Sequence, residues 1–189
     1  MTELPIQGIL LRVLSLIDDV GIPYLIMGGF AVRAIGVPRP SYDVDLTIDA
    51  SDPPLKRLFD ALARDGFMIP DEFHKGFRDS LMGMDKVKVQ KFDQDHVWDV
   101  ELFLVTTAYQ RAAFARRQKV RFLGGDRWMI TPEDLILHKL LANRRMDLVD
   151  AEEILKVQQS LDRLYLQEWA GRLEVRHCLD ELLRKGGLA

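Results

Sequence analysis

The spacing of apolar residues divides the chain into helices and strands. Apolar side chains that recur every three or four positions predict amphipathic helices, and alternation or a short apolar run predicts a strand. On this basis helices are expected at residues 5–19, 30–35, 52–66, 107–117 and from 131 onward. Strands are expected at residues 22–27, 43–48, 86–92 and 97–105, with two short strands within 122–130. The strands at 86–92 and 97–105 are expected to form an antiparallel hairpin through the turn at 93–96.

Two helix starts are marked by capping residues. Asp52 is expected to cap a helix whose next residue is Pro53. Thr131 is expected to cap the helix that begins at Pro132, and Asp134 completes an arrangement like a capping box. Capping of this helix explains Glu133 and Asp134 better than a catalytic role does.

Residues 68–85 have no clear period and a mixed charge. A solvated loop or an irregular strand is the favoured interpretation. His74, Lys75 and Arg78 lie in this stretch, and the alternative is that they contact a substrate.

Composition and charge exclude several classes of protein. The 26 Lys and Arg against 29 Asp and Glu give a net charge of −3, so the chain as a whole is not expected to bind polyanions. The single cysteine, Cys178, excludes an internal disulfide, and no pair of the four histidines has the spacing of zinc ligands. No apolar run approaches 18 residues and the start of the chain is not that of a signal peptide, so a cytoplasmic protein is expected.

The acidic face of the second predicted strand is the strongest chemical signal. Asp43 and Asp45 stand at i and i+2, so their carboxylates point the same way and repel each other without a cation. Divalent ions that prefer oxygen ligands remove this penalty. Upstream, Gly28 and Gly29 lie between a strand and a helix, where the backbone can approach a bulky anion, and Arg33 adds positive charge.

The chain has Gly28-Gly29, then a spacer of thirteen residues, then Asp43-Val44-Asp45. This order resembles the signature of the nucleotidyltransferase superfamily, which has the DNA-polymerase-beta-like fold. The resemblance implies an α+β fold with a small mixed β-sheet, helices on one side and a helical C-terminal region. It divides the chain into a catalytic core at 1–130 and a helical region at 131–189 that packs on the core.

A third carboxylate is expected from the strand at 97–105. Asp99 and Glu101 share one face of that strand, so periodicity does not choose between them. Members of the superfamily often have Trp-x-Val-Asp-Leu here, and alignment with Trp98-Asp99-Val100-Glu101-Leu102 favours Glu101. This chain departs from the family pattern by a Glu in place of Asp.

A second resemblance covers the helix after Thr131. The order of its motifs is common in nucleotidyltransferases of the abortive-infection type. The motifs are Pro-Glu-Asp-Leu, then Lys139-Leu140, Ala142-x-Arg144 and Asp147-Leu148-Val149-Asp150. By this resemblance Lys139 contacts a nucleoside triphosphate, and Arg144 and Asp147 order the site around it. A surface helix with ion pairs is the alternative.

Together the resemblances imply transfer of a nucleoside monophosphate from a nucleoside triphosphate to an acceptor. Asp43 and Asp45 would hold two Mg²⁺ ions, Glu101 would hold the ion on the acceptor side and help to take a proton, and Gly28-Gly29 would cradle phosphates. The abortive-infection type implies a toxin that acts on tRNA or protein and has an antitoxin partner, whereas small drug-modifying adenylyltransferases share the first motif. The alternatives are a non-catalytic nucleotide-binding or antitoxin-like module of the same fold, favoured by the Glu at 101, and a structural domain.

The densest basic segment runs from Arg111 to Arg121. Either it is a solvated surface or it holds a polyanionic acceptor such as RNA.

Overall fold

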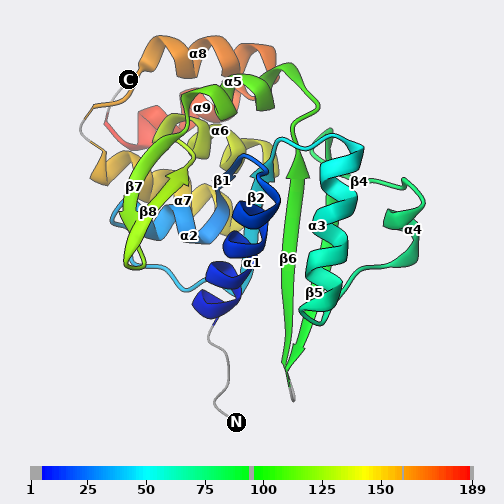
Figure 1. Ribbon diagram of the computed structural model, residues 1–189. Coiled ribbons are helices and arrows are strands. Elements are labelled where there is room, and N and C mark those ends of the chain that lie inside the picture. Colours follow the sequence, from blue (N-terminus) through cyan, green and yellow to red (C-terminus); the bar gives the residue numbers. More distant parts are fainter. Residues whose placement is uncertain (1–5, 94–95, 159, 188–189) are drawn as a thin grey trace.

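The computed structural model describes residues 6–93, 96–158 and 160–187 (Figure 1). The strands are β1 (Tyr24–Ile26), β2 (Asp43–Ile48), β3 (Phe67–Met68), β4 (Asp79–Leu81), β5 (Met84–Asp93), β6 (His96–Leu104), β7 (Gln118–Phe122) and β8 (Gly125–Met129). The helices are α1 (Ile6–Val20), α2 (Gly28–Ala34), α3 (Asp52–Arg64), α4 (Asp71–His74), α5 (Ala108–Arg116), α6 (Pro132–Ala142), α7 (Arg145–Val157), α8 (Arg163–Arg172) and α9 (Arg176–Lys185). The mixed sheet with helices confirms the predicted α+β class.

Within the described residues, eight strands form one mixed sheet in the order β3-β5-β6-β2-β1-β8-β7, with β4 paired to β5. β5 and β6 form the predicted antiparallel hairpin, and residues 94 and 95 of its predicted turn lie outside the described residues. β2 runs parallel to β6 and antiparallel to β1. The two strands that carry the acidic pattern are therefore direct neighbours at the centre of the sheet.

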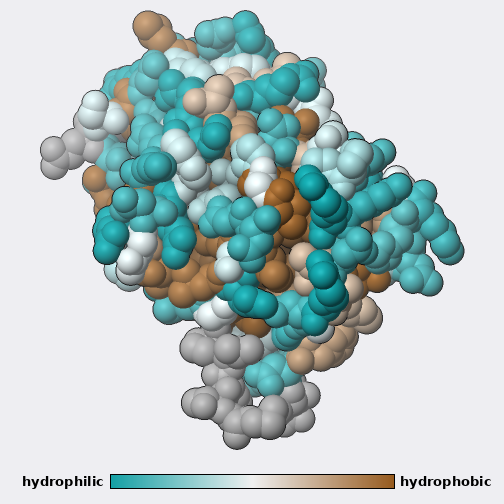
Figure 2. Space-filling view, in the orientation of Figure 1, coloured by the Kyte–Doolittle hydropathy of each residue, from teal (hydrophilic) through white to brown (hydrophobic). Residues whose placement is uncertain are grey.

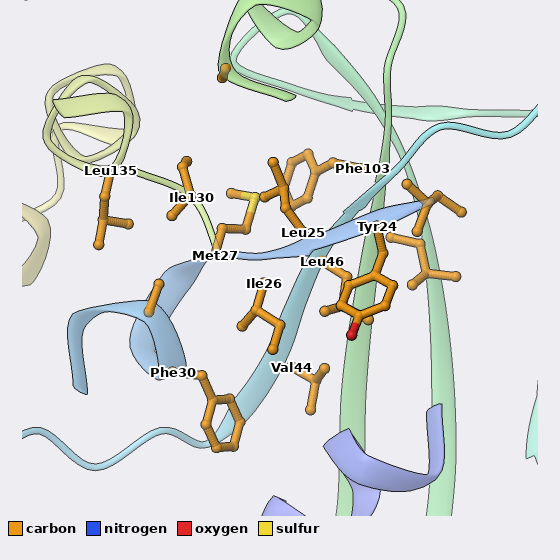
Figure 3. Close-up of a cluster of buried hydrophobic side chains, with 14 of the residues drawn as sticks. Tyr24, Leu25, Ile26, Met27, Phe30, Val44, Leu46, Phe103, Ile130 and Leu135 are labelled. Atoms are coloured by element: carbon orange, nitrogen blue, oxygen red, sulfur yellow. The ribbon is translucent and has the colours of Figure 1, made fainter. Parts of the chain in front are cut away.

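The core forms because β1 is apolar on both faces and β2 on one. Leu25 and Ile26 of β1 and Val44 and Leu46 of β2 are each no more than 1% exposed. Figure 3 shows these side chains packed around the centre of the sheet, with Phe30 of α2 below them. In Figure 1, α1 and α3 lie side by side across one face of the sheet, and α5 to α9 gather toward its β1 and β8 end. Burial of this continuous apolar surface is the main stabilising term.

Two local predictions are corrected. Asp52 is the first residue of α3 rather than its cap, because Ser51 takes the cap position with extended dihedral angles. Asp52 instead stands in the first turn, where a negative charge suits the helix dipole. Residues 68–85 are not a plain loop, since they include α4 and β4, and β4 pairs with β5. β4 and β5 form a tight hairpin through Met82 and Gly83, which both have positive φ, and β4 is too short for a period to show.

Among the described helices, none is long and apolar enough to cross a membrane. On the face seen in Figure 2, hydrophilic side chains predominate and hydrophobic ones emerge only in patches between them. The predicted boundary at residue 130 falls between β8 and α6, and the division into a core and a helical region stays a prediction.

Candidate active site

Carboxylates from β2 and β6 meet at a cavity between the sheet and α6. The parallel register places Asp43 opposite Asp99 and Asp45 opposite Glu101. Asp43, Asp45 and Glu101 line the cavity, whereas Asp99 does not. Asp99 instead accepts a hydrogen bond from Gln90 at 2.8 Å and pairs with Lys88 at 2.7 Å. Of the two candidates for the third acid, Glu101 is therefore the one that faces the cavity.

The cavity has a volume of about 260 Å³. It contains charged residues from the sheet and from α6 and α7, together with a glycine at the start of α2 and several apolar side chains. The lining residues are Met27, Gly28, Asp43, Asp45, Leu81, Met82, Lys86, Glu101, Phe103, Leu135, His138, Lys139, Ala142, Arg144 and Asp147.

Gly28 and Gly29 are the first two residues of α2, so the helix begins two residues earlier than its apolar pattern suggests. Gly28 has φ +61°, and a Cβ atom there would overlap the carboxylate of Asp45. A Cβ on Gly29 would lie 2.5 Å from the hydroxyl oxygen of Ser41. Each glycine thus allows a close approach by a polar side chain, and Gly28 packs directly against the acid site.

Arg33 does not line this cavity, so the structure does not bring it to the other predicted site residues. Its guanidinium lies 5.9 Å from the ring centroid of Phe30 and 5.7 Å from that of Phe122. Arg33 is five residues from Gly28, which turns it about 140° around α2 from the glycine. The cation–π contacts account for it without a ligand.

Asp45 has the most strongly shifted pKa of the site residues. Burial raises its pKa to about 7, and the nearby charges of Asp43 and Glu101 add to the rise. Lys139 and Arg144 oppose it. Asp43 and Asp45 make no ion pair within the described part of the chain, whereas the other two lining carboxylates do. The site therefore holds negative charge that a bound cation would stabilise.

Lys139 is held in a buried ion network. Its Nζ atom donates to Asp147 Oδ1 at 2.8 Å and lies 2.7 Å from Asp150 Oδ2. Arg144 Nε donates to Asp147 Oδ2 at 2.6 Å, and Arg39 Nη1 lies 3.0 Å from Asp150 Oδ2. Burial alone would raise the pKa of Asp147, but the hydrogen bonds from Arg144 and Lys139 hold it below its usual range. The network fixes the ammonium group at the cavity wall.

Two ionisable lining residues, Lys86 and His138, were not predicted from the sequence. Lys86 of β5 donates from Nζ to Glu101 Oε1 at 2.9 Å. His138 of α6 is 5% exposed, and burial, with a smaller contribution from Lys139, lowers its pKa to about 4, so its imidazole is neutral. The diagonal contact of Lys86 depends on the hairpin register, and no spacing within the sequence indicates it.

The donor set fits a divalent ion in part. Asp43 and Asp45 are carboxylates on one strand face, raised in energy by their own repulsion, and oxygen ligands of this kind suit Mg²⁺. Within the described residues, no group of three or more His, Cys, Asp and Glu side chains is arranged to hold a metal ion. Asp43 and Asp45 would therefore supply two ligands, and Glu101 is engaged by Lys86.

The predicted basic segment lies elsewhere and its charges contact other groups. None of its residues lines the cavity. Arg116 pairs with Glu133 at 3.3 Å and lies over the Tyr165 ring, and Arg121 lies 3.5 Å from Asp126. Arg117 and Lys119 both lie over the ring of Trp128. The contacts leave less free positive charge than the sequence suggests.

His74, Lys75 and Arg78 are also outside the acid cavity. They line a separate hollow with Phe59 and Phe73, and Arg78 pairs with Asp52 at 3.5 Å.

No protein-family model matches the chain, and no protein with curated function matches it in sequence. Solved structures do match. The nucleotidyltransferase-like protein from Paracoccidioides brasiliensis, described as antigenic, has 19% identity and a TM-score of 0.58 over 95% of this chain and 92% of its own. The chain has the fold of a nucleotidyltransferase. ANT(2")-Ia in complex with adenylyl-2"-tobramycin has 15% identity and a TM-score of 0.57, over 91% of this chain and 98% of its own. The lincomycin-bound lincosamide adenylyltransferase LnuA has 14% identity and a TM-score of 0.55, over 79% of this chain and 96% of its own.

Proposed function

We propose that the protein transfers a nucleoside monophosphate from a nucleoside triphosphate to an acceptor, with Mg²⁺ as cofactor. One observation carries this proposal: Asp43 and Asp45, which have no ion-pair partner among the described residues, line the same cavity as Lys139 and Arg144. Negative charge without a cation partner thus shares a cavity with an ammonium and a guanidinium that Asp147 holds in place. The divalent ion of a metal–triphosphate would neutralise the two carboxylates, and its phosphate oxygens would accept hydrogen bonds from the two cations.

In this proposal each residue has a role that follows from its position in the cavity. Mg²⁺ held by Asp43 and Asp45 would neutralise phosphate charge. Lys139 and Arg144 bind triphosphate oxygens, and Asp147 holds both cations in place. Gly28 and Gly29 let the chain approach the phosphates closely.

The chemical step is an in-line displacement at the α-phosphorus. The acceptor hydroxyl oxygen forms the new bond to phosphorus, and the bond to the bridging oxygen of pyrophosphate breaks. Glu101 takes the hydroxyl proton from its place on β6, and pyrophosphate leaves with the electron pair. Most of the catalysis comes from positioning and charge neutralisation.

We infer that the acceptor binds in a second cavity. It has a volume of about 320 Å³, shares Met82 with the acid cavity and is lined mainly by apolar and aromatic residues, including Met84, Tyr109, Leu141 and Trp169. An apolar recess beside the reacting centre suits a small hydroxylated molecule with an apolar face. Two of the similar structures hold an adenylylated aminoglycoside and lincomycin, which agrees with an acceptor of this size.

RNA, tRNA or protein as the acceptor, and a toxin role with an antitoxin partner, stay predictions from the abortive-infection resemblance. The basic segment 111–121 gives them little support, because its charges contact other side chains away from the cavity.

The test is a transfer assay with each α-³²P-labelled nucleoside triphosphate and Mg²⁺. Acceptor arms contain total RNA, a protein lysate, or a panel of hydroxylated small molecules. We expect pyrophosphate release and a labelled product in one arm, both lost in Asp43→Ala. Absence of transfer in every arm, or transfer undiminished in Asp43→Ala, contradicts the proposal.

The second candidate is a module that binds nucleotide without turnover. The Lys86–Glu101 pair favours it, because it occupies the acid that the reaction needs as a base. Calorimetric titration with a nucleoside triphosphate and Mg²⁺, beside the transfer assay, separates the two candidates: binding without product supports the module.

A further inference from the structure

We propose that Lys86 is a fixed internal cation for the acceptor side of the site, so that the protein binds one divalent ion at Asp43 and Asp45 and Glu101 acts without a metal ion. This inference rests on the proposed nucleotidyl transfer. It assigns Lys86 as a positioning residue and replaces the two-ion arrangement that the sequence resemblance implies.

The first argument is the contact itself. Lys86 Nζ lies 2.9 Å from Glu101 Oε1 and 3.8 Å from Asp79 Oδ2. The Lys86 side chain is only 10% exposed and the Glu101 side chain 20%. An ammonium group in such a place is stable only when it is paired, so Lys86 has reason to stay on Glu101. A divalent ion on the same carboxylate would have to displace it or share it.

The second argument is the distribution of charge in the cavity. Four lining carboxylates are present, and protein cations already satisfy two of them: Lys86 pairs with Glu101, and Lys139 pairs with Asp147. The remaining two, Asp43 and Asp45, are neighbours on one face of β2. The unsatisfied charge is therefore concentrated at one place, which suits a single ion. A second ion near Glu101 would meet an ammonium of the same sign.

The third argument is chemical. In the transfer step the O–H bond of the acceptor breaks, its proton passes to Glu101, and the oxygen bonds to phosphorus as pyrophosphate leaves. Lys86 holds one oxygen of Glu101 by a hydrogen bond, which fixes the carboxylate and leaves the other oxygen for the hydroxyl. The positive charge that a second ion would place there is thus supplied by the side chain of Lys86.

β5 offers a matched control. Lys88 lies two residues from Lys86 on the same strand face and pairs with Asp99 at 2.7 Å. Neither residue lines the acid cavity, and their side chains are 39% and 35% exposed. Lys88→Met removes a lysine–acid pair from β5 and β6 without changing the charge of the cavity.

The experiment counts Mn²⁺ ions by electron paramagnetic resonance, first with Mn²⁺ alone and then with α,β-methylene-ATP. Wild type and Lys88→Met are expected to bind one protein-held ion per chain. Lys86→Met is expected to gain a second ion, at least tenfold tighter than any second ion in wild type, with dipolar coupling between the two. Lys86→Gln keeps a hydrogen-bond donor without the charge, and it is expected to gain the same second ion if Lys86→Met does not fold.

Glu101→Gln gives an independent readout. If Glu101 is not a metal ligand, this variant keeps wild-type Mn²⁺ number and affinity while transfer falls at least a hundredfold. Two coupled ions in wild type, an unchanged ion count in the folded Lys86 variants, or weaker Mn²⁺ binding in Glu101→Gln overturns the inference. If wild type transfers nucleotide with two ions bound, only the role of Lys86 fails; if no transfer occurs in any arm, the proposed function fails.

Discussion

Asp45, which is half-buried, and Asp134, which is fully buried, both have pKa values raised by burial, yet they have opposite surroundings. Asp134 is fully buried in α6, where it accepts hydrogen bonds from Tyr165 at 2.6 Å and Thr131 at 2.7 Å, and Arg116 lies 3.5 Å away. Burial raises the pKa of Asp134 in spite of these partners. The pKa of Asp45 is raised for the same reason, but Asp45 has no ion pair in the part of the chain that the structure describes, and the charges of Asp43 and Glu101 raise its pKa further.

The difference shows how a structural acid can be told from a functional one. The partners of Asp134 come from α5, from the cap of α6 and from α8, and they join these three helices, so its charge stabilises the fold. In the proposed function, the charge of Asp45 is neutralised instead by a bound divalent ion. A perturbed pKa is common to both sites, so the missing partner, rather than the shift, marks the site that binds a ligand.

The largest expected effect comes from removal of the charge at Asp45. Asp45→Asn should lower kcat/KM of nucleotidyl transfer about a thousandfold, because the site loses a ligand for the divalent ion. Stability should be unchanged or higher, because the variant no longer has to bury a repelled charge. Enzyme kinetics and thermal unfolding of the same preparations test this. A variant that loses stability as well would place Asp45 in the same class as Asp134.

Removal of Asp134 should have the reverse effect. Asp134→Ala leaves Tyr165, Thr131 and Arg116 without their buried acceptor and should lower the free energy of unfolding by about 3 kcal/mol. Urea titration measures this loss. The kcat/KM per folded molecule should stay near wild type at a temperature where the variant is folded, since Asp134 does not line the acid cavity. A large loss of kcat/KM in the folded variant would contradict the comparison.

The smallest expected effect is the pH dependence of stability. Asp45 has a pKa of about 7 in the folded protein, above its ordinary value, so the folded state binds this proton more tightly. Its contribution is therefore full below about pH 4 and is lost as the pH rises through about 7. Without divalent ions, wild type should lose on the order of 1 kcal/mol per pH unit relative to Asp45→Asn within that window.

Urea titrations of both proteins from pH 4 to 8 measure this slope. The pKa of Asp134 is raised in wild type and in Asp45→Asn alike, so its contribution cancels when the slopes of the two proteins are subtracted. Saturating Mg²⁺ should flatten the wild-type slope, because the ion replaces the proton. Equal slopes in wild type and Asp45→Asn would show that Asp45 is not the group responsible.

The sequence predicted the parts of this molecule that depend on local pattern. Period-two alternation identified β2 and β6, and with them the face that carries Asp43, Asp45 and Glu101. The start of α6 was also predictable, because Thr131 accepts a hydrogen bond from the backbone N–H of Asp134 as a capping residue does. The α+β class was predicted from the family resemblance, and the mixed sheet with helices confirms it.

What the sequence could not give depends on register and on contacts between distant segments. Asp99 and Glu101 are equivalent by periodicity, and the family pattern alone favoured Glu101. In the structure Lys88 and Gln90 contact Asp99, whereas Glu101 lines the cavity. Arg33 was placed at the site by its nearness in sequence to Gly28, but α2 turns it toward Phe30 and Phe122. Lys86 was not foreseen for the same reason, since its partner Glu101 is fifteen residues away.

The bare Cα of Gly28 has a consequence for any attempt to vary this chain. The space that a side chain would take at this position is occupied by the carboxylate of Asp45. Even one methyl group there would act as a steric plug and push the acid out of alignment, besides straining a backbone at φ +61°. The glycine and the acid, seventeen residues apart, are therefore constrained as a single unit, and a library that varies one of them must vary both.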